Sequence, residues 1–538
     1  MRRSQVFTGT MRATLSPRYS MMAMLAATVA FGCTSDETDS AGATGAEDEV
    51  GAEETTGGAD DGVALDYEFP EDFGWGVALA GFQSEPGCPT LSAEACEDPN
   101  SDWYQWVTDP DLVADVGTHN SGDPLSAGPG MWETYEEDFT RAAEELSLNT
   151  IRISLEWSRL FPDPASETAT TPEELAAFAD TAAVARYHEV LAAARARGLE
   201  PMVTLNHYTL PLWIHDGKAC KADLDGCVNR GWVDLDRIAP AIRTFSAYCA
   251  AEFGGEVDLW ATLNEPMAVV ISGYLLPSAG RTNPPGVSLY VDEGVSVMFN
   301  MAEAHAQIYA AVHEHDTVDA NGDGVEVMVG PVPNLAAVEA VDPEDPEAET
   351  AVLHADHLYN WAWLNAAIRG EFDRNLDGEV DDIIPEYAGS ADFIGVNYYT
   401  KLLVEAIDLP VLSNNYPWFD FFPNISDLFN TYPEGLRRVL VDAHDRFGLP
   451  IYITENGTED MTIDQAEEFL KPHLVSVHEA IDAGVDVRGF YWWTLVDNYE
   501  WNHGMNLRFG LFALEEDKAR TMRPVGAAYA EIAASGGF

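Results

Sequence analysis

Basic residues are scarce in this chain of 538 residues. It has 28 lysines and arginines, only five of them lysines, against 91 aspartates and glutamates, which gives a formal net charge of −63. A surface of this sign repels phosphate backbones and anionic lipid headgroups, so we expect no nucleic-acid partner. The acidity and the low lysine content would suit a saline environment.

The N-terminal region has no apolar run long enough to cross a bilayer. Four arginines within the first 18 residues precede "MMAMLAATVAF", an eleven-residue stretch, whereas a spanning helix needs about 20 residues. This pattern is typical of an export signal. It ends in "AFGC", which resembles a bacterial lipobox. We therefore predict a lipoprotein-type signal peptide over 1–32 and a lipid anchor on Cys33. The alternative is an ordinary signal peptide with an incidental cysteine.

Large apolar residues are nearly absent from the next segment, which is rich in Ser, Thr, Gly, Ala, Asp and Glu. Such a segment cannot bury enough surface to fold, so we predict a flexible acidic linker over 33–66 and one folded domain over 67–538. This organisation predicts an exported protein, lipid-anchored at the outer membrane or cell surface of the bacterial envelope, or otherwise periplasmic or secreted.

The six cysteines include no CxxC motif and have no neighbouring histidine cluster, which argues against a zinc site. Cys88 with Cys96, and Cys220 with Cys227, are short-range pairs in loops that contain Gly and Asp. Each pair is a disulfide candidate in an oxidising compartment. Cys249 lies in the apolar helical stretch "FSAYCAAEF", where we expect a buried free thiol.

Short runs typical of β-strands alternate with amphipathic stretches from Phe73 onward. The stretches 178–198 and 433–448 have helical spacing and end at Gly. The eight strand-like runs are 73–80, 150–157, 200–207, 258–265, 325–334, 391–399, 450–456 and 487–495. Eight strands alternating with helices predict an α/β fold, a single (β/α)8 TIM barrel with loop insertions, which also suits the length of the chain.

Polar side chains gather at the ends of these runs, where the active sites of such barrels lie. Two are glutamates, Glu265 in "LWATLNEP" and Glu455 in "IYITENG". One glutamate at a strand end is equally well explained by a structural ion pair, but two on the fourth and seventh strands would face each other. A gap of about 5 Å would suit a retaining glycosidase, and about 6.5–9.5 Å an inverting one. Residues at the other strand ends are Gln83, Arg152, Glu156, His207, Asn264, Asn397, Tyr399 and Trp493.

The same two stretches carry a family resemblance. "TLNEP" and "ITENG" resemble the motifs of glycoside hydrolase family one, the β-glucosidase and β-galactosidase family. "DWYQW", "LNHYTLPLWIHD", "GVNYYT" and "WWTLVDNYEWNHGMNLRFG" are similar to family blocks in the same order, from about Phe73 to near the C-terminus. "GFQSE" and "EWSR" are closest to the archaeal-type β-glycosidase branch.

This resemblance implies that Glu455 is the nucleophile and Glu265 the acid/base. Arg152 should favour the ionised form of Glu455, whereas Glu265 must be protonated to act as the acid. The substrate-binding residues that the resemblance implies are Gln83, His207, Asn264 (on the sugar 2-hydroxyl), Asn397, Tyr399, Trp493, Glu500, Trp501 and Phe509. The alternatives are a satisfied core histidine for His207 and barrel packing for the two tryptophans.

The activity expected from the resemblance is that of a retaining, exo-acting β-glucosidase that also accepts galactosyl or fucosyl residues and needs no catalytic cofactor. Its substrates would be small β-glycosides and oligosaccharides. Family members that act on 6-phospho-sugars replace the acidic residue at Glu500 and supply basic residues, and "NYEWNHGMN" contains neither Lys nor Arg. The rivals are a transglycosylase with the same residues and a catalytically inactive surface sugar-binding protein.

Three departures from the family pattern concern the entrance and the sugar. Tyr208 stands where the family usually has Trp, and Phe429 stands on the aglycone side where the family usually has Trp. The segment 404–427 also differs, and four of its aromatic residues would form either a sugar-binding rim or a cover for the barrel. They are Trp418, Phe419, Phe421 and Phe422.

Two acidic stretches, 319–324 and 373–382, resemble calcium-binding loops, although neither has the Glu that closes an EF-hand loop. For Asp319, Asn321 and Asp323 an acidic turn is an equal alternative. For the second stretch we expect a structural calcium ion held by Asp373, Asn375, Asp377 and Asp381 or Asp382.

Overall fold

The computed structural model of the protein describes residues 65–407, 416–423 and 431–538. The predicted signal peptide, Cys33, nearly all of the predicted linker and Phe429 lie outside the described residues. Within the described part, no helix combines the length and the apolar character that a membrane span requires.

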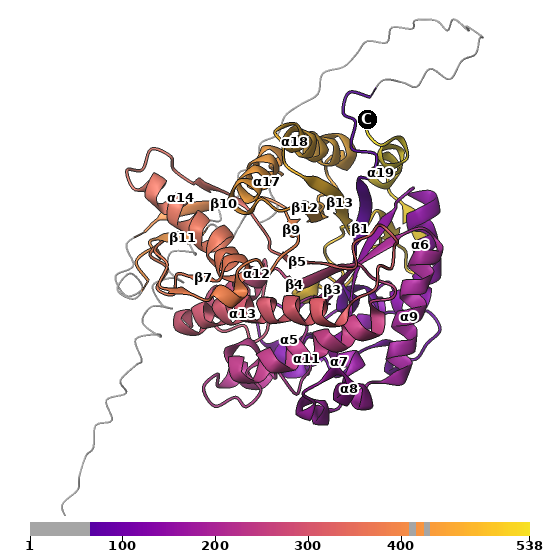
Figure 1. Ribbon diagram of the computed structural model, residues 1–538, viewed down its shortest axis with the longest axis horizontal. Helices are drawn as coiled ribbons and strands as arrows, with labels where there is room; N and C mark the ends of the chain where they lie inside the picture. Colours follow the sequence, from indigo (N-terminus) through magenta and orange to yellow (C-terminus); the bar gives the residue numbers. More distant parts are fainter. Residues whose placement is uncertain (1–64, 408–415, 424–430) are drawn as a thin grey trace, which may run out of the picture. The chain divides into compact units, whose positions relative to one another are not determined.

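Eight parallel strands form a barrel (Figure 1). Their hydrogen-bonded order is β5-β4-β3-β2-β1-β13-β12-β9. The strands are β1 (Gly74–Ala78), β2 (Thr150–Ser154), β3 (Glu200–Asn206), β4 (Leu259–Asn264), β5 (Met328–Val332), β9 (Ile394–Asn397), β12 (Ile451–Asn456) and β13 (Val487–Trp493). The barrel closes between β5 and β9, where the N–H of Asp392 donates to the carbonyl of Val329 at 2.8 Å. Every predicted run contains one of these strands, so the predicted TIM barrel is confirmed.

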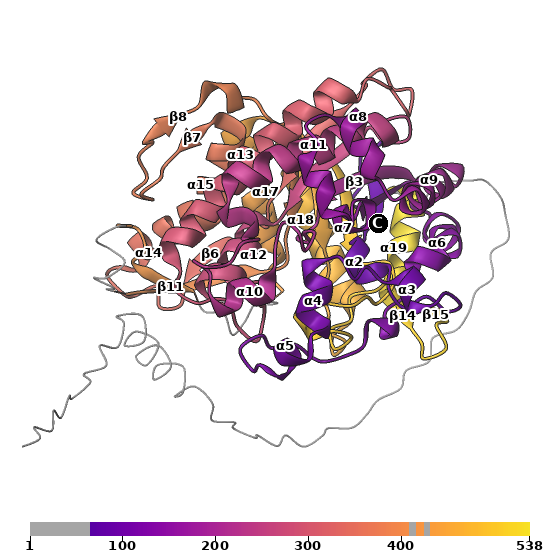
Figure 2. The ribbon, with the colours of Figure 1, turned by 90° about the horizontal axis from the view of Figure 1, so that it is seen from below.

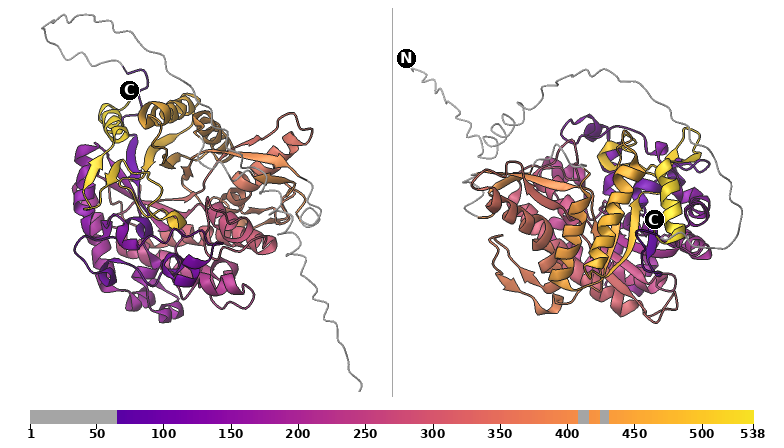
Figure 3. Two further views of the ribbon diagram at one scale, coloured as in Figure 1. Left: turned by 180° about the vertical axis from the view of Figure 1, so that it is seen from behind. Right: turned by 90° about the horizontal axis from the view of Figure 1, so that it is seen from above.

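Helices surround the strands and cover their outer faces (Figures 1 and 3). The longer ones are α6 (Met131–Thr140), α9 (Thr181–Ala196), α11 (Leu235–Phe253), α13 (Val291–His315), α17 (Pro433–Phe447), α18 (Lys471–Asp482) and α19 (Pro524–Ser535). The ends of two of them follow from the sequence. The Asp180 carboxylate accepts hydrogen bonds from the first N–H groups of α9. α17 begins at a proline and ends before Gly448, whose φ is +66°.

The barrel buries its strands almost completely, which explains why they appear in the sequence as nearly continuous apolar runs. A polar side chain near the end of such a strand lies away from bulk water and must find a partner inside the protein. The polar residues that interrupt β2, β4, β9 and β12 therefore interact with one another at the C-terminal mouth of the barrel.

Small sheets lie outside the barrel. β6 (Ala337–Ala340), β10 (Lys401–Ala406) and β11 (Phe421–Pro423) form one of them (Figure 2). Two others are the pairs β7 (Glu371–Phe372) with β8 (Asp382–Ile383) and β14 (Phe512–Leu514) with β15 (Arg520–Met522). Trp418 stacks on His354 with ring centroids 4.3 Å apart, and Phe419 stacks on Phe421. Trp418 therefore packs against α14 (Ala348–Asp356), outside the barrel, and the choice between a sugar-binding rim and a cover for the barrel stays a prediction.

The cysteines pair as predicted. Cys88 and Cys96 form one disulfide, and Cys220 and Cys227 form the other. Cys249 is a buried free thiol in α11. The bridges join residues eight and seven positions apart, so each closes a short local loop.

In the expected calcium loop, the carboxylates accept hydrogen bonds from backbone N–H groups of the same loop. Asp373 accepts from the N–H groups of Asp377 at 3.0 Å and Gly378 at 2.7 Å, and Asp381 accepts from the N–H of Arg374 at 2.8 Å. Among the described residues there is no cluster of three or more His, Cys, Asp or Glu side chains that could hold a metal ion. The calcium prediction, which also included Asn375, is therefore not supported. The loop is an acidic turn, and the same holds for 319–324, where Asp319 accepts three backbone hydrogen bonds.

Candidate active site

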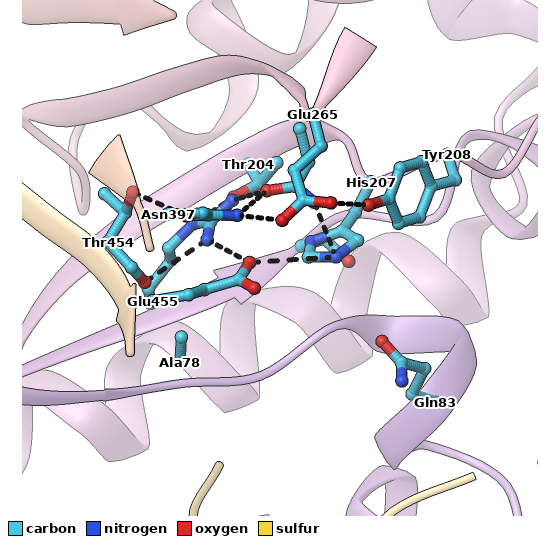
Figure 4. Close-up of polar contacts among 12 residues, drawn as sticks. Ala78, Gln83, Thr204, His207, Tyr208, Glu265, Asn397, Thr454 and Glu455 are labelled. Atoms are coloured by element: carbon cyan, nitrogen blue, oxygen red, sulfur yellow. Dashed lines mark hydrogen bonds and ion pairs between the residues drawn. The ribbon is translucent and has the colours of Figure 1, made fainter. Parts of the chain in front are cut away.

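The two predicted glutamates lie at the same end of the barrel (Figure 4). Glu455 lies in β12 and is 3% exposed. Glu265 follows β4 and precedes α12 (Pro266–Val270). Its φ of +45° is in the left-handed region, which turns the backbone from the strand into the helix. Figure 4 shows both carboxyl groups directed into one space between the two strand ends.

Glu455 is held by two donors. Arg152 Nη1 donates to Oε1 at 2.7 Å and the Tyr399 hydroxyl donates to Oε2 at 2.7 Å. Burial and the like charge of Glu265 raise the pKa of Glu455 to about 7, while Arg152 and Tyr399 oppose that rise. Arg152 and Tyr399 therefore favour the charged form of Glu455, whereas burial and the like charge of Glu265 disfavour it.

Arg152 connects Glu455 to its surroundings. It is fully buried in β2, and its Nη2 donates to Asn264 Oδ1 at 2.7 Å, while its Nε donates to Thr204 Oγ1 at 2.9 Å. The planar guanidinium therefore fixes Glu455 and Asn264 relative to each other.

Glu265 has a different environment, with neutral donors only. Asn397 Nδ2 donates to Oε1 at 2.8 Å and the Tyr208 hydroxyl donates to Oε2. Asn397 is itself oriented by Thr454 Oγ1, which donates to its Oδ1 at 2.8 Å. Of the described basic side chains, none forms an ion pair with Glu265, whereas Arg152 pairs with Glu455. These unequal partners favour a charge on Glu455 more than on Glu265.

His207 lies next to the pair, 4.0 Å from Glu455 Oε1. Asn264 directs its Oδ1 to Arg152, so its Nδ2 donates to His207 Nε2 at 3.1 Å and the histidine carries its proton on Nδ1. Burial lowers the pKa of His207 well below its usual value, as do the cations Arg152 and Arg281, so the ring is neutral. Its Nδ1 is buried and has no partner among the described residues, as expected for a donor reserved for a ligand.

A third carboxylate lies across the site. Gln83 Nε2 donates to Glu500 Oε2 at 2.8 Å, and Gln83 Oε1 is buried without a partner in the part of the chain that the structure describes. Arg281 Nη1 lies 3.7 Å from Glu500 Oε1. Burial raises the pKa of Glu500 to about 7, while Arg281, Gln83 and Trp493 oppose that rise. These polar groups can donate to and accept from the hydroxyl groups of a sugar.

Aromatic side chains line the same space. Trp493, at the end of β13, and Trp501 both stack on His207, with centroids 5.8 Å and 5.9 Å away. Trp501 also stacks on Phe82 at 5.7 Å and is 2% exposed, so it packs the wall as well as bordering the site. The Phe509 ring lies edge-on to Tyr399 at 6.2 Å.

Glu156, which stands near the end of the second run, belongs to a separate buried cluster. Its carboxyl group accepts hydrogen bonds from Ser154 and Thr209, at 2.9 Å and 2.6 Å. Burial and the neighbouring Glu85 raise its pKa to about 8. Arg159 pairs with Glu85 at 2.8 Å and is the cation of this cluster.

Sequence reasoning did not find every residue of the site. Thr204 and Thr454 lie within strands next to the residues they orient, so their position inside a run is a usable signal. Arg281 comes from the loop between η6 (Ile271–Leu275) and α13, and no periodicity marks it. The Tyr208 hydroxyl donates to Glu265, a contact that the sequence alone does not indicate.

Two buried carboxyl groups with unlike partners, inside a polar and aromatic site at the C-terminal mouth of a (β/α)8 barrel, define a glycoside hydrolase. Residues 65–538 match the glycosyl hydrolase family 1 model, and the chain belongs to this family as a β-glycosidase. Enzymes of this family need no cofactor for catalysis.

The chain is similar to known relatives over most of their length. The chain is 34% identical to a β-galactosidase of Saccharolobus solfataricus over 498 residues, which is 87% of this chain and 96% of the relative. It is 34% identical to a β-galactosidase of Pyrococcus woesei, over 82% of this chain and 92% of the relative. Among solved structures it is similar to the β-glycosidase of Thermosphaera aggregans, with a TM-score of 0.74 and 28% identity over 88% of this chain and 98% of that one.

Proposed function

We propose that the enzyme is a retaining, exo-acting β-glycosidase, most active as a β-glucosidase, that works by double displacement. The observation that carries this proposal is the unequal environment of the two glutamates. Arg152 and Tyr399 favour a charged Glu455, the form a nucleophile needs, while Glu265 has only neutral donors and suits a proton carrier.

In the first step Glu455 attacks the anomeric carbon while Glu265 gives its proton to the oxygen of the leaving group. Once the glycosyl-enzyme ester has formed, the charge of Glu455 is gone, so Glu265 can act as a base. It then takes a proton from a water molecule, whose oxygen attacks the anomeric carbon and releases Glu455. Asn264 would hold the sugar 2-hydroxyl beside the reacting carbon, where hydrogen bonds strengthen in the transition state.

The remaining residues would bind an unmodified terminal sugar. Gln83 Oε1 and His207 Nδ1 offer one acceptor and one donor that the described side chains leave unpaired, and Glu500 offers carboxylate oxygens. An acidic residue at this place disfavours a phosphate on the sugar, which supports unphosphorylated substrates. Trp493 would form an apolar floor for the C–H face of the sugar.

The test is the hydrolysis of 4-nitrophenyl β-glucoside and β-galactoside by the wild type, Glu455→Ala and Glu265→Ala, with and without azide. We expect Glu455→Ala to be inactive and azide to restore turnover with a glycosyl azide as the product. The ratio of the two wild-type rates would report the sugar preference. A wild type that binds glucose but cleaves neither substrate would contradict the proposal.

We further propose that the enzyme is exported and lipid-anchored through Cys33. The export-type N-terminus and the two disulfides support an oxidising compartment outside the cytoplasm. The test is fractionation of cells that express the full-length chain. Wild type should sediment with membranes, Cys33→Ala should not, and an equal distribution of the two would contradict the lipid anchor.

A further inference from the structure

Tyr208 makes a contact that its position in the family motif does not require. It stands where related sequences usually carry Trp, and its hydroxyl donates to Glu265 Oε2. Together with Asn397, it is one of two described side chains that donate to this carboxyl group. The close-up shows the Tyr208 hydroxyl directed at the Glu265 carboxyl group from the end of β3 (Figure 4).

The ring of Tyr208 is fixed by its neighbours, so the hydroxyl has a defined place. The residue is 6% exposed and has a φ of +70°, in the left-handed region, directly after His207. Its ring meets Trp501 edge-on at 4.9 Å, and the guanidinium of Arg281 lies 4.9 Å from its centroid. A cation above the ring adds to this packing.

Resting on the proposed function above, we propose that Tyr208 is a positioning residue for the acid/base. Its hydroxyl holds the Glu265 carboxyl group in its reactive orientation and stabilises the ionised form that activates water in the second step. A donor to a carboxylate favours the charged form of that carboxylate, and charge-assisted hydrogen bonds are stronger than neutral ones.

A phenol suits both halves of the cycle. When Glu265 has given its proton to the leaving group, Tyr208 donates to the resulting carboxylate. When Glu265 has taken a proton from water, the same oxygen can accept a hydrogen bond, which an indole N–H cannot do. Burial and the neighbouring Glu265 raise the pKa of Tyr208 well above its usual value, so the phenol keeps its proton throughout.

The first test is the pH dependence of kcat/KM for 4-nitrophenyl β-glucoside with Tyr208→Phe, which keeps the ring and removes the donor. We expect the alkaline limb to move to higher pH by about one unit. We also expect kcat to fall more for alkyl glucosides, whose leaving groups need the proton, than for a 2,4-dinitrophenyl glucoside. Tyr529→Phe is the matched control, because it removes a buried hydroxyl that bonds only the backbone of Gly76 and Phe490.

A second test keeps the fold intact. 3-Fluorotyrosine at position 208 has a more acidic hydroxyl, which donates more strongly, so the alkaline limb should move to lower pH. An unmoved limb in both proteins, with equal losses for all leaving groups, would overturn the role of Tyr208 while leaving the proposed function in place. A wild type that cleaves no β-glycoside would overturn the proposed function and this inference together.

Discussion

The guanidinium group of Arg281 lies 3.7 Å from the carboxylate of Glu500 and 5.0 Å from the centroid of Trp501. The two charged residues come from loops after different strands, β4 and β13. Asn283 fixes the arginine by accepting from its Nε at 2.8 Å. A cation therefore borders a site whose local sequence around Glu500 contains none, and it favours the ionised form of this carboxyl group.

Replacement of Arg281 by methionine should weaken sugar binding. Without the cation, the pKa of Glu500 rises above its present value of about 7, so Glu500 is protonated over more of the working range. We expect KM for 4-nitrophenyl β-glucoside to rise about tenfold near pH 6.5, equivalent to about 1.4 kcal/mol, with a smaller change in kcat. Arg243→Met, which removes a surface pair with Glu314, is the control. Equal KM values for the two variants would contradict this role.

Replacement of Glu265 by glutamine should remove the alkaline limb of the pH–rate profile. The amide cannot lose a proton in this range, so no loss of the acid form remains to slow the reaction at high pH. Steady-state rates with a 2,4-dinitrophenyl glucoside, which needs little acid assistance, give the clearest profile. A limb that persists unchanged would show that another group is the acid.

Replacement of Tyr399 by phenylalanine should shift the acidic limb of the pH–rate profile rather than the alkaline one. Its hydroxyl donates to Glu455 and lowers the pKa of that carboxyl group, so its removal raises the pKa further above about 7. Because the nucleophile must be ionised, the acidic limb of kcat/KM should move to higher pH by up to about one unit. The measurement is the same pH profile used for Tyr208→Phe, and a shift of the alkaline limb instead would contradict the assignment.

The buried cluster around Glu156 should make stability depend on pH. The pKa of Glu156 is about 8 in the folded protein, above its ordinary value of 4.5. Its stabilising contribution is therefore complete below about pH 4.5 and is lost as the pH rises through about 8. At pH 8, Glu156→Gln should unfold at a higher urea concentration than the wild type. Its free energy of unfolding should also depend less on pH between pH 5 and pH 8. Glu349→Gln, on the exposed face of α14, should follow wild type.

The eight strands, the two disulfides and the strand-end glutamates were all predictable, because each leaves a local pattern. Buried strands appear as apolar runs, and a glutamate that ends such a run is conspicuous. The stretches 178–198 and 433–448 were also predictable as helices, and they contain α9 and α17, which Asp180 and Gly448 cap.

What the sequence could not reveal depends on distant contacts. Arg281 acquires its role only when its loop folds over Tyr208 and Trp501. The calcium prediction failed for a related reason, since the carboxylate of Asp373 that would bind a metal ion accepts backbone N–H groups of its own loop instead.

The division of the site between strands and loops has a consequence for how the enzyme can diversify. Arg152, Asn264 and Glu455 lie in β2, β4 and β12, whose residues are all buried in the barrel, so a change of side-chain volume there disturbs the packing. Arg281 and Glu500 stand on connecting segments, which accept substitution and insertion more readily. Mutations in these segments can therefore change which sugar is accepted, while the residues that cleave the glycosidic bond stay the same.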